Sequence, residues 1–192
     1  MNMLIFALHT DGLSEKTARA LYPAADAPHA DAFRAFPDRI AVQTSLAGNV
    51  LLRYAAARAL GVPMRDVTTD RLPSGQPTLP GTGLFCSVSH TDGLCVCAVS
   101  DAPVGIDAEL LREAPMRVAK RVFSAGEQQS IAAADDADRA FFEIWTKRES
   151  AVKLTGAGLR DIRAAIPPQI RTETFLLHGA YCVSVSTFTE SS

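Results

Sequence analysis

The sequence predicts a protein of mixed helices and strands, the α+β class, built from two halves, residues 1–101 and 102–192. Two observations favour this class. Both halves contain apolar residues at helical spacing, and both contain short apolar stretches, typical of strands, that turn residues separate from the helices. With 192 residues, 47% of them hydrophobic, the chain is long enough to bury a core without disulfides or structural metals.

The first half should begin with a strand at Met3–Leu8. Short helical pieces are expected between Ser14 and Asp38, where prolines interrupt an alanine-rich stretch. A longer helix is predicted over Ser45–Leu60, because apolar residues recur there every three or four positions. Gly61 follows directly, and since glycine readily adopts the left-handed conformation that ends many helices, this helix should end there.

Prolines and glycines crowd Thr68–Gly83, so we expect a loop of fixed shape in that segment. Two strands are predicted next, at Leu84–Ser89 and Leu94–Ser100, joined by a hairpin turn with an Asp-Gly pair. A third strand is expected at Val104–Glu109, after a short turn that contains a proline.

The second half should hold two capped helices and a hairpin. Ser124 and Glu127 have the spacing of a capping box, which predicts a helix from there to about Ala134. One of the two aspartates that follow can cap the next helix, which should end at Gly156. The alternating apolar residues of Glu173–Phe188 predict a β-hairpin.

The charge balance excludes a broad basic groove, since 19 lysines and arginines stand against 21 aspartates and glutamates. We therefore expect no nucleic-acid partner. No apolar run approaches the roughly 18 residues of a membrane span, and a cytoplasmic protein is expected. Cys95 and Cys97 lie in an apolar strand with no second pair at zinc spacing, so we expect buried small hydrophobes rather than a metal or redox site.

Two carboxylates lie two positions apart on the predicted strand Val104–Glu109, in the sequence VGIDAE. Alternation places Asp107 and Glu109 on the same face of this strand, roughly 6.6 Å apart along the chain. Acids held side by side repel each other unless a cation lies between them, and oxygen ligands suit Mg²⁺ or Mn²⁺. The alternative is a strand whose polar face is simply in contact with water.

A third carboxylate lies on the predicted helix Phe141–Thr155. Trp145, Glu149 and Lys153 are spaced four and four and therefore line one helix face. With Lys147 and Arg148 close by in sequence, this arrangement suits a site where a carboxylate and cations share a phosphorylated ligand. The alternative is an ordinary Glu–Lys pair on a solvated helix.

Ser89 and His90 end the strand FCSVSH, before a tight turn. Neighbours on a strand point to opposite faces, so the pair is poorly suited to nucleophilic catalysis. Contact with phosphate from the hydroxyl, the imidazole and nearby backbone N–H groups is the functional interpretation. A histidine with a purely structural role is the alternative.

Five segments in this order resemble one family, the Sfp-type 4′-phosphopantetheinyl transferases. They cover Gly75 to Leu159 and comprise the turn Gly75-Gln76-Pro77 and the stretches FCSVSH, VGIDAE, RVFSAGE and WTKRESAVKLTGAGL. The resemblance implies a Mg²⁺-dependent enzyme that moves the phosphopantetheine arm of coenzyme A to a serine of an acyl or peptidyl carrier protein, releasing adenosine 3′,5′-bisphosphate. It also implies a pseudo-dimeric fold, in which one chain forms two similar α/β halves with the active site in the cleft between them. The protein is expected to be a monomer.

The resemblance also assigns roles to residues. Asp107, Glu109 and Glu149 are implied as ligands of Mg²⁺, with Mn²⁺ as an alternative ion. Glu149 would take the proton of the incoming serine, and Lys153 would contact or protonate the leaving phosphate, so the implied catalytic residues are Glu149, Lys153 and Asp107. Contacts to the coenzyme are implied for Ser89, His90, Gln76, Pro77, Arg39, Thr44 and Lys153.

Three positions depart from the family pattern. Gln76 replaces a lysine that helps to hold the nucleotide phosphate, and the helix near Gln43 lacks an arginine, for which Arg39 one turn upstream is a candidate substitute. Arg148 stands where a lysine usually precedes the glutamate, and the two are not equivalent at a tight phosphate contact. We hypothesise that the metal chemistry is intact while recognition of the 3′-phosphate is relaxed.

Carrier proteins of this class are acidic, so the enzyme should offer them a basic surface. The candidates flank the predicted catalytic residues and are Arg112, Arg117, Lys120, Arg121, Arg160 and Arg163. Two rival functions are kept: a non-catalytic protein that binds a carrier or a nucleotide, and a Mg²⁺-dependent phosphotransferase that acts on another nucleotide substrate.

Overall fold

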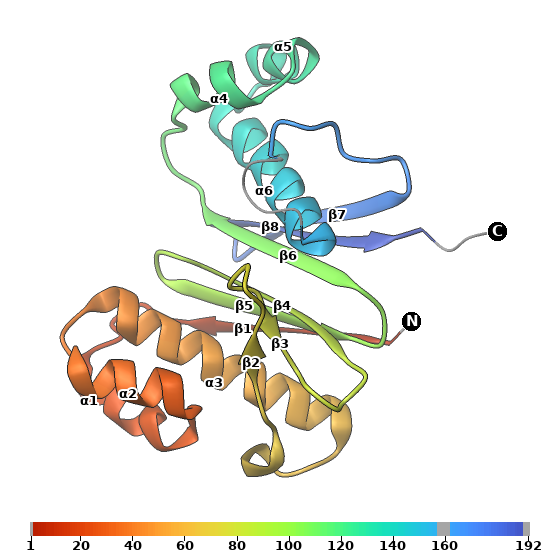
Figure 1. The fold of residues 1–192 in the computed structure, drawn as a ribbon. Helices are drawn as coiled ribbons and strands as arrows, with labels where there is room; N and C mark the ends of the chain where they lie inside the picture. The colour runs from red at the N-terminus through yellow and green to blue at the C-terminus, as the bar shows by residue number, and fades with distance from the viewer. Residues whose placement is uncertain (1, 157–161, 190–192) are drawn as a thin grey trace. The chain divides into compact units, whose positions relative to one another are not determined.

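Two sheets of three strands each, with helices packed beside them, form the core of the structure (Figure 1). The computed structural model describes residues 2–156 and 162–189. These residues group into two compact units, Met1–Val104 and Gly105–Ser192, so the boundary lies three residues beyond the expected one at Asp101. The mixture of helices and strands confirms the predicted α+β class.

Unit 1 packs one long helix against its sheet. Its elements are β1 (Met3–His9), α1 (Glu15–Leu21), the 3-10 turn η1 (Tyr22–Ala24), α2 (Ala27–Ala35), α3 (Ile40–Leu60), the 3-10 turn η2 (Met64–Asp66), β2 (Asp70–Arg71), β3 (Pro77–Thr78), β4 (Phe85–Thr91) and β5 (Leu94–Ser100). The sheet order is β1-β5-β4, and both pairings are antiparallel. Small residues of α3 such as Ala47 and Ala55 pack with Cys97 and Val99 of β5, which builds the core of this unit.

Unit 2 has its own sheet and its own core. Its elements are β6 (Val104–Leu110), α4 (Met116–Val122), α5 (Ala125–Ala133), α6 (Ala137–Thr155), β7 (Ile170–Leu177) and β8 (Tyr181–Phe188). The sheet order is β6-β8-β7, and β7 pairs antiparallel with β8. Phe141 and Phe142 of α6 pack with Phe123, Ile131 and Cys182, so α6 joins the smaller helices to the sheet.

The two units share one order of elements. In each, a first strand is followed by helices and then by a hairpin, and the second strand of that hairpin lies in the centre of the sheet, next to the first strand. Unit 1 adds the short ladder of β2 and β3 before its hairpin. The pseudo-dimeric arrangement with a cleft stays a prediction.

Most of the expected elements are present, including the strands β1, β4, β5 and β6 and the capped helices α5 and α6. Two differences stand out. Helix α3 begins at Ile40, five residues before the predicted start at Ser45. The apolar pattern did not indicate this first turn, because Ile40 is 76% exposed and does not face the core. Helix α4 was not expected, since it is only seven residues long and has no side-chain cap.

The burial predicted for Cys95 and Cys97 is confirmed. Cys95 and Cys97 are fully buried, and all four cysteines are free thiols. Burial raises the pKa of the Cys95 thiol to about 11, which keeps it protonated and unreactive. Within residues 2–156 and 162–189, no helix is long and apolar enough to cross a membrane.

Candidate active site

Strand β6 turns its two carboxylates toward α6. A side-chain carbon added to Gly105 would lie 2.0 Å from the carbonyl oxygen of Ser150 and 2.5 Å from the amide nitrogen of Leu154. Only glycine therefore allows the helix to approach the strand this closely. Because side chains alternate along a strand, Asp107 and Glu109 share the face of Gly105 and look toward the same helix.

Helix α6 supplies the third carboxylate and a lysine. Asp136 caps its start by accepting a hydrogen bond from the amide of Arg139, and Gly156 ends it in the left-handed conformation, with φ of 70°. Hydroxyl groups fix the helix on the sheet, since Ser150 Oγ lies 2.8 Å from Ser186 Oγ of β8. Glu149, the residue before Ser150, is buried, with only 8% of its surface exposed.

Cations neutralise two of the carboxylates. Lys153 Nζ donates to Asp107 Oδ1 at 2.7 Å, across 46 positions of sequence. Arg112 Nη1 lies 3.3 Å from Glu109 Oε2 and is half exposed. Lys153 therefore pairs with Asp107 of the neighbouring strand, and the simple surface pair with Glu149 is not what the structure shows.

The electrostatics of Glu149 link the whole cluster. Burial raises the pKa of Glu149 from 4.5 to about 7, and the negative charges of Asp107 and Glu109 act in the same direction, while Lys153 opposes them. All three carboxylates are therefore close enough for their charges to interact. A base with a pKa near neutrality is suited to accept a proton at physiological pH.

The donor set suits a divalent cation in kind. Three carboxylates offer hard oxygen ligands, and their mutual repulsion at Glu149 is what a bound Mg²⁺ would relieve. Among the residues that the structure describes, however, no three acidic, histidine or cysteine side chains are already gathered around one point as metal ligands. Instead, the Lys153 ammonium lies at Asp107.

Arg148 has a different place from the one expected beside a phosphorylated ligand. Its guanidinium donates to both carboxylate oxygens of Glu127, at 2.9 and 2.7 Å, and to the carbonyls of Ile162 and Ala164. The side chain is only 6% exposed. Consecutive helix residues point about 100° apart, so Arg148 faces away from the carboxylates and binds the segment after α6. No local sequence motif signals this pair, because Glu127 lies 21 positions before Arg148.

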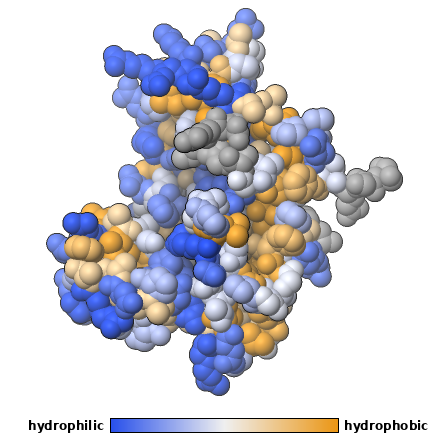
Figure 2. All heavy atoms as spheres, viewed as in Figure 1, coloured by the Kyte–Doolittle hydropathy of each residue, from blue (hydrophilic) through white to orange (hydrophobic). Residues whose placement is uncertain are grey.

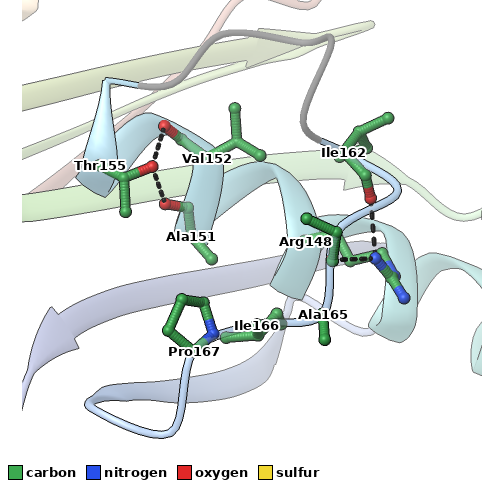
Figure 3. A pocket seen from close by; sticks show the side chains of 9 residues that line it. Arg148, Ala151, Val152, Thr155, Ile162, Ala165, Ile166 and Pro167 are labelled. Carbon is green, nitrogen blue, oxygen red and sulfur yellow. Dashed lines mark hydrogen bonds between the residues drawn. The ribbon is translucent and has the colours of Figure 1, made fainter.

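An apolar pocket lies beside this arginine. It encloses about 200 Å³ between the second half of α6 and residues 162–167 (Figure 3). In Figure 3, the bond from Arg148 to the carbonyl of Ile162 forms part of the wall, with Val152 and Ile166 also lining the space. Trp145 lies outside it and stacks on Phe141, with ring centroids 6.2 Å apart.

The expected coenzyme contacts of unit 1 form two groups. Ser89 is buried and His90 exposed on β4, and His90 pairs across the sheet with Cys95, whose thiol lies 3.8 Å from the carbonyl oxygen of Thr44. The carbonyl of Pro77 accepts a bond from the thiol of Cys86, four positions before His90 and roughly 13 Å along the strand. Thr44 and His90 thus share a neighbour, whereas Pro77 lies toward the other end of β4.

Arg39 and the turn at Gln76 are two of the places where the sequence departs from the family pattern. Arg39 precedes α3 and stacks on the ring of Phe36 at 4.2 Å, and it remains exposed. An arginine side chain, which was not predicted from the sequence, binds the turn that contains Gln76. Arg71 donates to the carbonyl of Gly75 at 2.8 Å, and its Nη2 lies 2.9 Å from Nε2 of His29. No local motif signals this contact between residues 42 positions apart.

Comparison with known proteins identifies the family. A sequence profile of the 4′-phosphopantetheinyl transferase superfamily matches residues 103–188, which include all four residues of the carboxylate and lysine cluster. The chain is 32% identical over 164 residues to a 4′-phosphopantetheinyl transferase of Bacillus pumilus, covering 82% of this chain and 70% of the relative. The chain belongs to the 4′-phosphopantetheinyl transferase superfamily.

Other relatives agree. A 4′-phosphopantetheinyl transferase of Bacillus subtilis is 30% identical over 161 residues, which cover 82% of this chain and 72% of the relative. One from a Nostoc species is 34% identical over 134 residues, 64% of this chain and 56% of the relative. The expected enzyme class, a phosphopantetheinyl transferase, is confirmed.

Proposed function

We propose that this transferase moves the 4′-phosphopantetheinyl group of coenzyme A to a serine of an acyl or peptidyl carrier protein, with Mg²⁺ as cofactor. The observation that supports this most directly is the cluster of Asp107, Glu109, Glu149 and Lys153 between β6 and α6. When an alcohol attacks a pyrophosphate, a base must accept the alcohol proton, and a nearby positive charge must stabilise the leaving phosphate. The cluster contains both.

In the proposed reaction, the serine oxygen bonds to the phosphorus that carries pantetheine, and the bond from this phosphorus to the bridging oxygen breaks. Glu149 accepts the serine proton, consistent with its pKa near neutrality. Lys153 stabilises the departing phosphate of adenosine 3′,5′-bisphosphate. Asp107, Glu109 and Glu149 would hold Mg²⁺, which supplies positive charge to the pyrophosphate when bound.

For the nucleotide end, the proposal assigns contacts in unit 1 to Ser89, His90, Thr44, Gln76 and Pro77. We also propose that recognition of the 3′-phosphate is relaxed. Gln76 carries no charge, and the guanidinium of Arg39 is stacked on Phe36. This supports the hypothesis that fewer charged contacts reach this phosphate than the family pattern implies.

The proposed docking surface for the carrier is α4. Arg117, Lys120 and Arg121 are exposed along this helix, and no ion pair within the described residues involves them. Figure 2 shows hydrophilic residues covering the end of unit 2 where α4 and α5 lie. Arg112 is engaged with Glu109, Arg163 is exposed, and Arg160 lies outside the described residues.

Docking can be tested with charge reversals. Lys120→Glu should raise KM for the carrier protein several-fold with little change in kcat, and added salt should shrink the difference. Lys16→Glu, at an exposed lysine of unit 1, is the matched control. Equal KM values for the two variants at low salt would refute the docking surface.

The transfer itself is tested by intact mass spectrometry. The protein is incubated with coenzyme A, Mg²⁺ and an apo carrier protein, and the carrier should gain the mass of phosphopantetheine. Glu149→Gln should abolish the gain, whereas Glu143→Gln, on the same helix but paired with Arg139, should not. No gain with several carriers would favour a binding protein or another nucleotide substrate, and a gain that survives Glu149→Gln would refute the assigned base.

A further inference from the structure

The ion pair of Lys153 and Asp107 lies inside the proposed metal site. Asp107 is almost fully buried, with 7% of its side chain exposed, whereas 25% of Lys153 is exposed. The lysine stem therefore reaches from the surface inward to place its ammonium 2.7 Å from the buried carboxylate. A cation already occupies the position next to Asp107.

We propose that Lys153 is the counter-ion of the carboxylate cluster in the metal-free protein and that a divalent cation must displace its ammonium from Asp107. This inference rests on the proposed metal site, and it adds a second role for Lys153 before any substrate is bound. The released ammonium then becomes available to an anionic ligand.

The charges around the cluster support this role. Asp107, Glu109 and Glu149 face the same space from β6 and α6, and close carboxylates repel one another when no cation lies among them. Arg112 also contributes, but its contact to Glu109 is longer, at 3.3 Å, and its side chain is 49% exposed. Water screens such a pair, so Lys153 provides the stronger neutralisation.

The lysine side chain is suited to exchange. Its ammonium is a compact charge on a flexible stem of four carbons, so it can leave Asp107 without movement of α6. Arg148, by contrast, is held by Glu127 and by two backbone carbonyls. Lys153 is also the more exposed of the two cations, at 25% of its side chain against 6% for Arg148.

The Lys153 ammonium should lower the affinity of the cluster for divalent cations. A divalent cation at the cluster is repelled by the ammonium and must compete with it for Asp107. Removing the ammonium takes away both effects, so Lys153→Met should bind Mg²⁺ and Mn²⁺ on the order of tenfold more tightly than the unmodified protein. Lys153→Arg keeps the charge and should stay close to the unmodified protein.

Calorimetric titration with Mg²⁺ or Mn²⁺, without coenzyme A, tests the inference. Lys147→Met is the matched control, because Lys147 lies on the same helix about 200° around from Glu149. Tighter binding by Lys153→Met alone supports the proposal, and unchanged or weaker binding overturns it. Should neither the unmodified protein nor Lys153→Met bind either ion, the proposed metal site itself is wrong, and this inference with it.

A second measurement needs no variant. The rate at which an amine-acylating reagent modifies Lys153 can be followed by peptide mass spectrometry, with and without Mn²⁺. Displacement from Asp107 should raise this rate several-fold, while the rate at Lys147 stays constant. An unchanged rate at Lys153 under conditions where calorimetry shows Mn²⁺ bound would overturn the proposal.

Discussion

Glu149→Gln should stabilise the metal-free protein at alkaline pH, although it should abolish transfer. In the folded protein, burial and the charges of Asp107 and Glu109 raise the pKa of Glu149 from 4.5 to about 7. The folded state therefore keeps a proton that the unfolded state releases between these pH values. The stability of the unmodified protein falls as pH rises through this window, whereas glutamine does not titrate.

The size of the effect follows from the two pKa values. Each pKa unit corresponds to about 1.4 kcal/mol, so the full cost of ionising buried Glu149 lies between about 3 and 4 kcal/mol well above pH 7. Part of this cost is already present at pH 5. The advantage of Glu149→Gln should thus be on the order of 2 kcal/mol larger at pH 8 than at pH 5.

The assay is urea unfolding of both proteins at pH 5 and pH 8, in chelator to remove divalent cations. The difference between the two pH values cancels any constant cost of burying an amide. Adding Mg²⁺ at pH 8 should then stabilise the unmodified protein and not the variant, because ligands that bind only the folded state raise its stability. An advantage that does not grow with pH would refute the assigned electrostatics of Glu149.

Three further outcomes are expected. Gly105→Ala should cost about 3 kcal/mol or more in urea unfolding and weaken Mg²⁺ binding, since the added carbon would meet the backbone of α6 at 2.0 Å; an unfolding midpoint like that of the unmodified protein would contradict this close approach. Arg148→Met should destabilise the protein by about 3 kcal/mol, because Glu127 loses a buried partner, and Arg148→Lys should fall between, as unfolding curves can show. Coenzyme A and its dephospho form should bind with affinities within about tenfold of each other in calorimetry, because each missing charged contact contributes roughly 1.5–3 kcal/mol; a strong preference for coenzyme A would exclude a relaxed 3′-phosphate site.

Several elements were predictable because their signals are local. The capping box of Ser124 and Glu127 is present as expected, and Gly61 ends α3 in the left-handed conformation, with φ of 67°. The Asp-Gly turn joins β4 to β5 in the predicted antiparallel pair. Each of these features depends on residues within about four positions of one another, so the sequence displays the whole interaction.

Other features were not predictable in the same way. Helix α4 has neither a cap nor a long apolar stripe, and α3 starts at residues whose side chains face solvent. The short ladder of Asp70 and Arg71 with Pro77 and Thr78 lies in a segment rich in breakers, where a loop alone was expected. In each case the segment lacks the cap or the apolar periodicity from which an element can be predicted.

Local patterns alone indicated the α+β class, the ends of α3 and α6 at Gly61 and Gly156, and the family, and they singled out the acids and the lysine of the candidate site. The tertiary structure was needed to show which charges meet. Arg148 is adjacent to Glu149 in sequence but binds Glu127, and Lys153 binds Asp107, 46 positions away, rather than Glu149 one turn away. The reason is that ion pairs depend on the packing of α6 against β6 and α5, and this packing brings together residues that are far apart along the chain.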